Sequence, residues 1–391
     1  MKAGSKTIYF LPEHEAFRLH VRDFLNQHIR PHLQTWEQEK KIAAFAWEKL
    51  GEEGFLGLSY SKSIFGQEKD FFYSAIFLEE LGYLGFGGFR VSIAVHAYMA
   101  TAYLANHGSR KLQDHYLQLA LQGKKIAALA ITEPQAGSDL NNLLTTADKK
   151  DGCYVLNGSK RYIANGTIAD YFIVAVKTNQ KQSTNKFGAT GVSLLVVDKE
   201  TPGLTIKAID TLGWHCAATA EILFNEVHVP ETNLIGSENQ GFLYLMKNLQ
   251  LERLVAGLMA LGEVSYCLDV TCEYLKQRQV YGAALGKLQT VRHRLAHLKT
   301  EVSAIKQLAY HGVWLYQTGE FPIEEAAMVK LKATELAKQV SHECMQLAGA
   351  AGFQQDSAIS RIYRDAPAAT IAAGASEVLL DIIAQFELDC R

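Results

Sequence analysis

Residues 129–139 read LAITEPQAGSD, and residues 154–166 read YVLNGSKRYIANG. In the first stretch, apolar and β-branched residues continue up to Thr132, which predicts a buried strand. Pro134 then ends that strand, because proline lacks a backbone donor and restricts the residue before it. The second stretch has the alternation and the polar turn residues of further strands.

Small and polar residues follow the first strand and punctuate the second stretch. Gly137 allows a ligand to come close to the backbone, and the Ser138 hydroxyl can hold a phosphate or carbonyl oxygen. Asn157-Gly158 and Asn165-Gly166 are typical of tight turns between strands. These features alone fit a ligand site and an ordinary antiparallel sheet with solvated loops equally well.

The chain around these stretches divides into three parts by the period of its apolar residues. A period of two from residue 126 to Pro230 predicts a small β-domain, whereas the flanking parts have helical spacing. We therefore expect an α+β fold with an N-terminal helical domain, a middle β-domain and a C-terminal helical bundle. The expected boundaries are 1–125, 126–236 and 237–391.

Specific elements are expected within these parts. The chain is expected to be helical again from about Gly241. One helix is expected to begin at Asn248, and another is expected to end at Gly282, which is placed as a helix terminator. Further strands are expected at 171–177, 192–198, 204–208 and 220–229, and further helices at 289–307, 323–347 and 370–386.

The composition excludes several classes of protein. The 391 residues suffice for two or three domains, and a net charge of −2 gives no attraction to nucleic acid or to an anionic membrane. No run of about 18 apolar residues is expected to span a bilayer, and the polar start of the chain (residues 1–6) lacks a signal-peptide core. The six cysteines, Cys390 among them, form no CxxC pair, which favours reduced thiols and a cytoplasmic protein.

Two ordered motifs make the sequence more specific than its composition. Thr-Glu-Pro-x-Ala-Gly-Ser-Asp at 132–139, followed by Asn-Gly-x-Lys-x-x-Ile-x-Asn-Gly at 157–166, resembles the FAD-binding middle domain of the acyl-CoA dehydrogenase family. The resemblance extends over nearly the whole chain. It implies FAD-dependent α,β-dehydrogenation of an acyl thioester, with an electron-transferring flavoprotein as the usual electron acceptor and a homotetramer as the assembly.

The resemblance also implies how the middle domain contacts the flavin. The first motif lies along the pyrimidine edge, and the second lays an aromatic ring and backbone against the isoalloxazine. Position 164 usually carries Thr or Ser to hydrogen-bond flavin N5, so Ala164 leaves only a backbone amide for that bond. The implied contacts are Leu129, Ile131, Thr132, Gly137, Ser138, Tyr162, Ile163 and Ala164.

Segments of the C-terminal part resemble those that serve the cofactor, several of them across a subunit boundary. Ala350 replaces a glycine beside the pyrophosphate, and Ala375 replaces a threonine that bonds the cofactor. Ala164 and Ala375 thus remove two hydrogen bonds to the flavin cofactor. Each bond is worth only about 0.5–1.5 kcal/mol, so weaker FAD binding is expected rather than none. The implied residues are Arg278, Gln289, Gln346, Gly349, Ala350, Ala375 and Glu377.

A base must remove the α proton in this reaction, and a carboxylate can be that base if burial raises its pKa. Many family members carry this base in a Glu-Gly-Thr motif near the C-terminus, where Ala373 stands here. The isovaleryl- and long-chain-type branches carry it instead in a Glu-Arg-Leu motif, which Glu252-Arg253-Leu254 matches. The resemblance therefore predicts Glu252 as the base, and the flanking leucines favour its burial. The alternative is a solvated surface glutamate.

The remaining substrate contacts follow from the same resemblance. The thioester oxygen would be held by the backbone N–H of Ala373 and by the ribityl 2′-hydroxyl of FAD, so alanine suffices at that position. Gln250 and Arg253 match positions that touch the pantetheine arm or its phosphates, although an ordinary salt bridge is an alternative role for Arg253. Ser138 and Gly374 complete the expected substrate-binding set.

Two other functions remain open at this point. One keeps the chemistry but places the acyl or aminoacyl group on a carrier protein instead of coenzyme A. The other is a flavin-poor, non-catalytic family member, which Ala164, Ala350 and Ala375 motivate. No metal site is predicted, because His293 and His297 share a helix face without a third ligand nearby.

Overall fold

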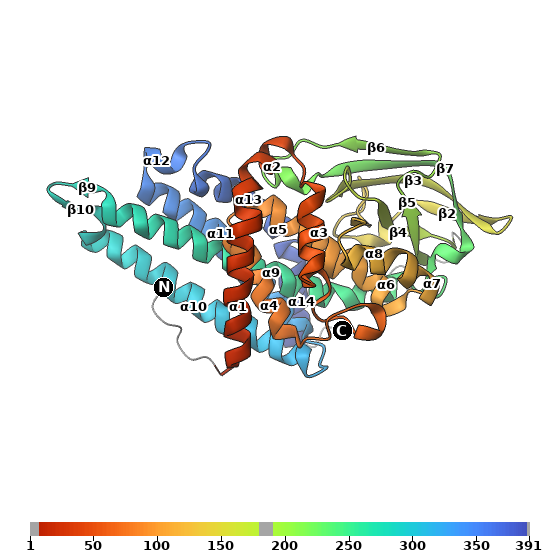
Figure 1. Cartoon of the computed structure of the whole chain (residues 1–391), viewed down its shortest axis with the longest axis horizontal. Coiled ribbons are helices and arrows are strands. Elements are labelled where there is room, and N and C mark those ends of the chain that lie inside the picture. Colours follow the sequence, from red (N-terminus) through yellow and green to blue (C-terminus); the bar gives the residue numbers. More distant parts are fainter. Residues whose placement is uncertain (1–7, 180–190, 389–391) are drawn as a thin grey trace.

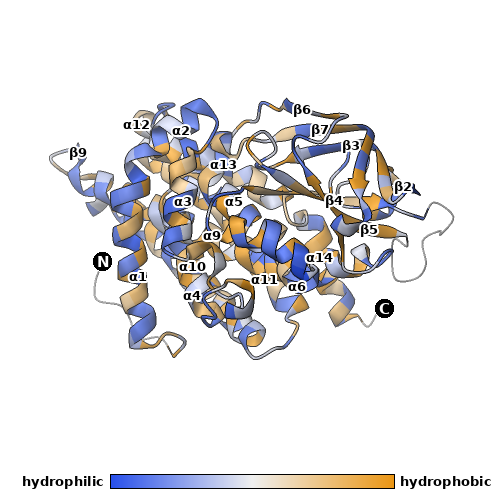
Figure 2. Cartoon of the chain, turned by 45° about the vertical axis from the view of Figure 1, so that its right-hand side comes forward, coloured by the Kyte–Doolittle hydropathy of each residue, from blue (hydrophilic) through white to orange (hydrophobic). Residues whose placement is uncertain are grey.

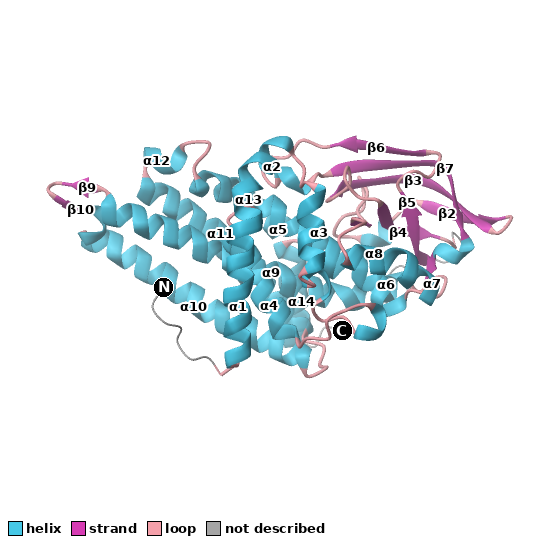
Figure 3. Ribbon diagram, in the orientation of Figure 1, coloured by secondary structure: helices cyan, strands magenta, loops and turns pink. Residues whose placement is uncertain are grey.

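Helices, a β-sheet and a second set of helices follow one another along the chain (Figures 1 and 3). This computed structural model describes residues 8–179 and 191–388. Cys390 and the polar start of the chain (residues 1–6), on which the signal-peptide prediction rests, lie outside the described residues. The predicted α+β class and the order of the three parts are confirmed.

Short helices make up the part before the sheet. The first begins at Pro12, where proline costs nothing because the first-turn N–H groups have no helical partner. Figure 2 shows hydrophobic and hydrophilic residues alternating around this helix, as one buried face requires. The helices are α1 Pro12–Phe24, α2 Leu33–Glu39, α3 Ala44–Glu52, α4 Phe71–Tyr83, α5 Gly87–Ala94, α6 Thr101–His107, α7 Arg110–Leu112 and α8 Gln118–Leu121.

The middle part is one eight-stranded sheet with the strand order β6-β7-β3-β2-β4-β5-β8, and β1 pairs with β4 in parallel. Most other neighbours are antiparallel, and the central strands β4 and β5 are buried along nearly their whole length. The strands are β1 Ala127–Ala130, β2 Thr146–Lys150, β3 Cys153–Ile163, β4 Tyr171–Lys177, β5 Val192–Asp198, β6 Leu204–Ala208, β7 Ala220–Pro230 and β8 Leu234–Ile235.

One of the two predicted turns in the sheet is wrong. Asn157-Gly158 lies inside β3, where the register with β7 shifts between Leu156 and Gly158. Gly158 has φ +141°, and a Cβ there would lie 2.7 Å from the Thr145 Cα, so the glycine permits a bulge and not a turn. Asn165-Gly166, in contrast, does form the turn after β3.

Long helices return after the sheet, and two predictions about them need correction. The two helices predicted between Asn248 and Gly282 are one helix, which begins at Gly241 and ends at Gln277, before Gly282. Tyr281 (φ 51°) and Gly282 (φ 79°) instead form the two-residue turn of a hairpin, for which positive φ at both positions is typical. The single helix expected at 370–386 is two helices separated by a loop. The elements are α9 Gly241–Gln277, β9 Gln279–Val280, β10 Ala283–Ala284, α10 Gln289–Gln317, α11 Ile323–Ala348, α12 Ala350–Phe353, α13 Ala358–Ile371 and α14 Ser376–Glu387.

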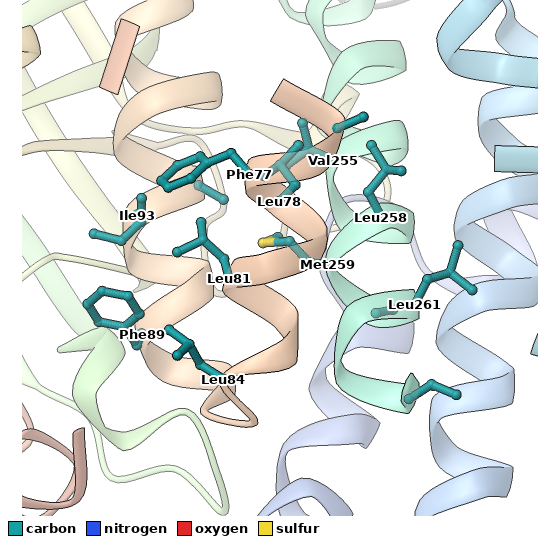
Figure 4. Close-up of a cluster of buried hydrophobic side chains, with 14 of the residues drawn as sticks. Phe77, Leu78, Leu81, Leu84, Phe89, Ile93, Val255, Leu258, Met259 and Leu261 are labelled. Atoms are coloured by element: carbon teal, nitrogen blue, oxygen red, sulfur yellow. The ribbon is translucent and has the colours of Figure 1, made fainter. Parts of the chain in front are cut away.

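Helix α9 lies at the centre of the helical core and packs closely on α4. Their apolar side chains face one another in Figure 4, among them Leu78 and Leu81 from α4 and Met259 from α9. Glycines bring the two backbones together, since a Cβ on Gly262 would lie 2.0 Å from the Glu79 carbonyl oxygen. This packing fixes α9, which carries the residues of the site, against the N-terminal helices.

The expectation that no segment is apolar enough to cross a membrane is wrong for α9 by length and composition. However, 72% of its apolar window is buried inside the protein, so the core position accounts for the composition. The bent pair α13 and α14 passes the same test only when the two are taken as one span.

Candidate active site

Glu252 lies in α9 and is only 4% exposed, so the solvated-surface alternative is wrong. Two side chains donate hydrogen bonds to its Oε1 atom: Tyr103 Oη of α6 at 3.1 Å and Asn248 Nδ2, one turn earlier in α9, at 2.9 Å. No hydrogen bond to Oε2 is recorded among residues 8–179 and 191–388. One oxygen is therefore anchored, and the other is available to a substrate.

Burial raises the pKa of the Glu252 carboxyl. The hydrogen bonds from Asn248 and Tyr103, and the charge of Arg253, act in the opposite direction because they favour the ionised form. A carboxylate whose pKa is raised is a stronger base than an exposed glutamate.

Arg253, the next residue, is nearly buried and donates from Nη1 to Gln250 Oε1 at 2.9 Å. Its Nε atom is buried and has no hydrogen-bond partner in the described part of the chain, nor does Arg253 form an ion pair there. The described residues therefore do not support the alternative role of Arg253 in an ordinary salt bridge. A buried donor without a partner is a candidate contact for a ligand.

The loop between α13 and α14 lies beside Arg253. Ala373 (φ 54°) and Gly374 (φ 100°) both have left-handed backbone, which interrupts the helix predicted there. A Cβ on Gly374 would lie 3.9 Å from Arg253 Nε, and Lys330 Nζ of α11 donates to the Gly374 carbonyl oxygen at 2.5 Å. The structure therefore brings together the predicted base, Gln250, Arg253, Ala373 and Gly374 from distant parts of the chain.

The two motifs of the middle part also meet directly. The Arg161 backbone N–H donates to the Thr132 carbonyl at 2.8 Å, which joins the end of the first motif to the second. Beneath them the Glu133 carboxylate pairs with buried Lys160 at 2.7 Å and accepts the N–H groups of Leu144 and Thr145. Burial lowers the pKa of Lys160 to about 8 although Glu133 opposes this shift. The ion pair holds the loop that follows the strand.

The residues expected to contact a flavin form a surface that such a ring system could cover. Tyr162 has φ 61° and is 58% exposed, so a flat aromatic face points away from the core. A Cβ on Gly137 would meet nothing within 4 Å, and Ser138 is exposed. Ile163 is buried, so only its backbone is available to a ligand. Half-buried side chains complete this set: Leu129, Ile131, Thr132 and Ala164.

The other expected cofactor residues form a second, separate group. A small apolar cluster of Leu275, Val291 and Leu347 joins the ends of α9, α10 and α11. Figure 1 shows this end, marked by β9, β10 and α12, on the opposite side of the molecule from the sheet. The exposed residues there are Arg278, Gln289, Gln346, Gly349 and Ala350, whereas Ala375 and Glu377 lie with the Gly374 loop.

A pocket of about 380 Å³ adjoins Glu252 through Tyr103 and Asn248, which line it. Its wall combines aromatic side chains with the polar side chains of Lys247 and Glu320. Sequence reasoning missed Tyr103, Asn248 and Lys330. The spacing of four residues between Asn248 and Glu252 was a usable signal, because such residues are neighbours on a helix. Tyr103 and Lys330 carry no comparable local signal.

Comparison with known proteins identifies the family of the chain. The acyl-CoA dehydrogenase N-terminal domain, middle domain and C-terminal domain match residues 11–124, 128–227 and 239–388. The mitochondrial long-chain specific acyl-CoA dehydrogenase of Sus scrofa is 34% identical over 96% of this chain and 86% of its own. A crystal structure of acyl-CoA dehydrogenase from Geobacillus kaustophilus is 38% identical, with a TM-score of 0.93 over 98% of this chain and all of that chain.

Two further solved structures are similar at 29% identity and name ligands or substrates. An FAD complex of PigA has a TM-score of 0.92 over 98% of this chain and 99% of that chain. The prolyl acyl carrier protein oxidase AnaB has a TM-score of 0.89 over 97% of this chain and 99% of that chain. With all three domains matched, this chain belongs to the acyl-CoA dehydrogenase family of oxidoreductases that act on CH–CH groups.

Proposed function

We propose that this protein oxidises the α,β carbon–carbon bond of an acyl thioester, with Glu252 as the base and FAD as the hydride acceptor. The observation that carries this proposal is the buried Glu252 carboxyl, which has one oxygen available to a substrate and whose neighbour in the chain, Arg253, lies against the Ala373–Gly374 loop. Position 373 has no carboxylate of its own, so Glu252 is the acidic group that the family chemistry requires there.

Each residue of the site has a defined task in this reaction. Glu252 removes the α proton through Oε2, while Tyr103 and Asn248 hold Oε1. Bound FAD supplies the acceptor for the β hydride, so the thioester loses one proton and one hydride and becomes α,β-unsaturated. The Ala373 N–H holds the thioester oxygen, on which negative charge develops as the proton leaves.

The two separated groups of cofactor residues support a homo-oligomer, for which we propose a tetramer. Tyr162 belongs to β3 of the sheet, whereas Arg278 precedes the β9–β10 hairpin, which Figure 1 shows on the side of the molecule opposite the sheet, so one FAD molecule would use the two surfaces from two copies. Exposed aromatic side chains at the second surface, Tyr281 at 98% and Phe353 at 76%, also favour contact with another copy. We further propose a cytoplasmic protein that passes its electrons to an electron-transferring flavoprotein.

Two groups could carry the acyl chain as its thioester. Coenzyme A is the first, in keeping with the long-chain relative from Sus scrofa. A carrier-protein-bound acyl group is the second, and the similarity to AnaB favours it. The apparent affinity for acyl-CoA and for the same acyl group on a carrier protein would distinguish them.

Spectroscopy of the purified protein tests the proposal directly. We expect a yellow protein with one noncovalent FAD per chain, whose flavin absorbance bleaches when an acyl thioester is added without oxygen. A protein that remains colourless after reconstitution with excess FAD would instead support the flavin-poor alternative. A yellow protein that no member of a broad panel of acyl-CoA and acyl-carrier thioesters reduces would refute the proposed reaction.

A further inference from the structure

A buried lysine lies behind the loop that carries the proposed oxyanion donor. Lys330 of α11 has 0% exposed surface, and its Nζ donates to the Gly374 carbonyl oxygen at 2.5 Å. The buried cations Arg90 and Lys160 are each paired with a glutamate, at 2.8 and 2.7 Å. Lys330 has no such ion pair within the described residues, and its recorded partner is a backbone carbonyl.

An ammonium group in this position costs free energy. Taking a charge out of water is expensive unless a partner of opposite charge compensates it. Burial, followed by the charge of Arg253, lowers the pKa of Lys330 to about 8, while the charges of Glu335 and Glu377 act in the opposite direction. A leucine or methionine would fill the same space without this cost. The lysine therefore needs a reason beyond packing.

The loop that it contacts supplies the reason. Ala373 and Gly374 both have positive φ, and such backbone persists only when its surroundings hold it. Arg253 also lies against the loop, with its Nε 3.9 Å from the position of a Gly374 Cβ. Lys330 and Arg253 therefore bring two cationic side chains against this one loop.

We propose that Lys330 is a positioning residue whose hydrogen bond to the Gly374 carbonyl fixes the loop so that the Ala373 N–H faces the thioester oxygen. This inference rests on the proposed function, because it assigns Lys330 to the same thioester site. The lysine itself does not touch the substrate. It acts through the loop and through its charge, which stabilises the oxygen as the α proton leaves.

Substitutions of Lys330 separate its hydrogen bond from its bulk. Lys330→Met removes the donor and the charge at similar length, Lys330→Gln keeps an N–H donor, and Lys332→Met is the matched control at an exposed position of the same helix. Loss of an oxyanion donor itself typically costs about 10²–10³-fold. We therefore expect Lys330→Met to lower the limiting rate of flavin reduction about tenfold or more, with little change in the half-saturating thioester concentration. Lys330→Gln should recover part of this rate, and Lys332→Met should match the wild type.

A ligand titration gives a second readout that a purely structural role would not move. A 3-ketoacyl thioester ionises to an enolate with its own near-ultraviolet absorbance, so the apparent pKa of the bound ligand can be measured. That pKa should be higher in Lys330→Met than in the wild type, because the enolate oxygen loses its support. If Lys330→Met does not fold, the same upward shift, smaller in size, is expected in Lys330→Gln.

The outcomes separate this inference from the proposed function. Equal ligand pKa values and equal reduction rates in the wild type and the folded Lys330 variants would overturn the role of Lys330 alone. A wild type that no thioester reduces would overturn the proposed function instead.

Discussion

Glu252 is held by one oxygen and free at the other, which makes it the residue whose removal is most informative. Glu252→Gln keeps nearly the same volume and removes the proton acceptor, so fold and FAD content should survive. Base catalysis is typically worth about 10²–10⁴-fold, and we expect flavin reduction by substrate to slow at least that much. Glu273→Gln, at an exposed position of the same helix, is the control. Near-normal reduction in Glu252→Gln would exclude Glu252 as the base.

Tyr103 sets the ionisation of that base from a different helix. Its hydrogen bond favours the charged carboxylate and lowers the pKa of Glu252, against the upward effect of burial. Tyr103→Phe removes the bond, so the pKa of Glu252 should rise. The low-pH limb of the flavin reduction rate should then move to higher pH, because more of the base is protonated at any given pH. Tyr98 is a buried tyrosine of the same helical stretch, and Tyr98→Phe should leave the low-pH limb of the flavin reduction rate unchanged. If this limb does not move in Tyr103→Phe either, the proposed role of Tyr103 is contradicted.

At the scale of elements, Asp365 of α13 ties the C-terminal helices to the rest of the fold. Its two carboxyl oxygens accept the Gly87 N–H of α5 at 3.0 Å and the Trp214 N–H at 2.7 Å. An amide has one acceptor oxygen, so Asp365→Asn leaves one buried N–H unpaired and should lower the free energy of unfolding by about 1–3 kcal/mol. Urea denaturation measures this, with exposed Asp356→Asn as the control.

The difference in the free energy of unfolding between the wild type and Asp365→Asn should also depend on pH, which gives a separate test. Burial raises the pKa of Asp365 to about 7, whereas an unfolded aspartate has a pKa of about 3.9. Between these values the folded state binds a proton that the unfolded state has released, so the contribution of Asp365 to stability falls as the pH rises from about 4 to 7. Asp365→Asn lacks this titration, and the stability gap between the wild type and the variant should narrow over that range. A gap that widens would show that Asp365 is ionised in the fold.

Local periodicity predicts most of the elements. The features that it does not predict are determined by contacts between residues distant in the sequence. The strands at 171–177 and 192–198 matched the structure because their apolar runs are continuous and bounded by polar turns. Gly158 was assigned to a turn because the close approach of Thr145 is invisible in the sequence. The break at Ala373 was missed for the same reason, since Lys330 and Arg253 hold that loop from other helices. Glu252 was found through its motif, whereas Tyr103 has meaning only once α6 and α9 are packed together.

At the scale of the whole molecule, the residues expected to bind FAD lie on two separate surfaces of the chain. Tyr162 lies on β3 of the sheet, and Arg278 lies at the β9–β10 hairpin on the opposite side of the molecule (Figure 1), so a monomer would offer FAD only part of the expected contacts. The first half lies on the sheet, which the helices support, and the second lies on the hairpin end, which one small apolar cluster organises. Binding of FAD and association of chains should therefore stabilise each other.

Arg278→Ala tests this coupling because Arg278 is exposed next to the hairpin, beyond the C-terminal end of the helix that carries Glu252. Removal of its side chain should lower the affinity for FAD and shift the assembly toward smaller species together, and added FAD should reverse part of the shift by mass action. Light scattering at several FAD concentrations measures the assembly, and the flavin absorbance that stays with the protein measures the bound FAD. Arg110→Ala, an exposed arginine of α7 outside the hairpin end, should change neither. A wild-type monomer that carries a full complement of FAD would contradict the shared site, because a single chain would then hold the cofactor without the hairpin surface of a second copy.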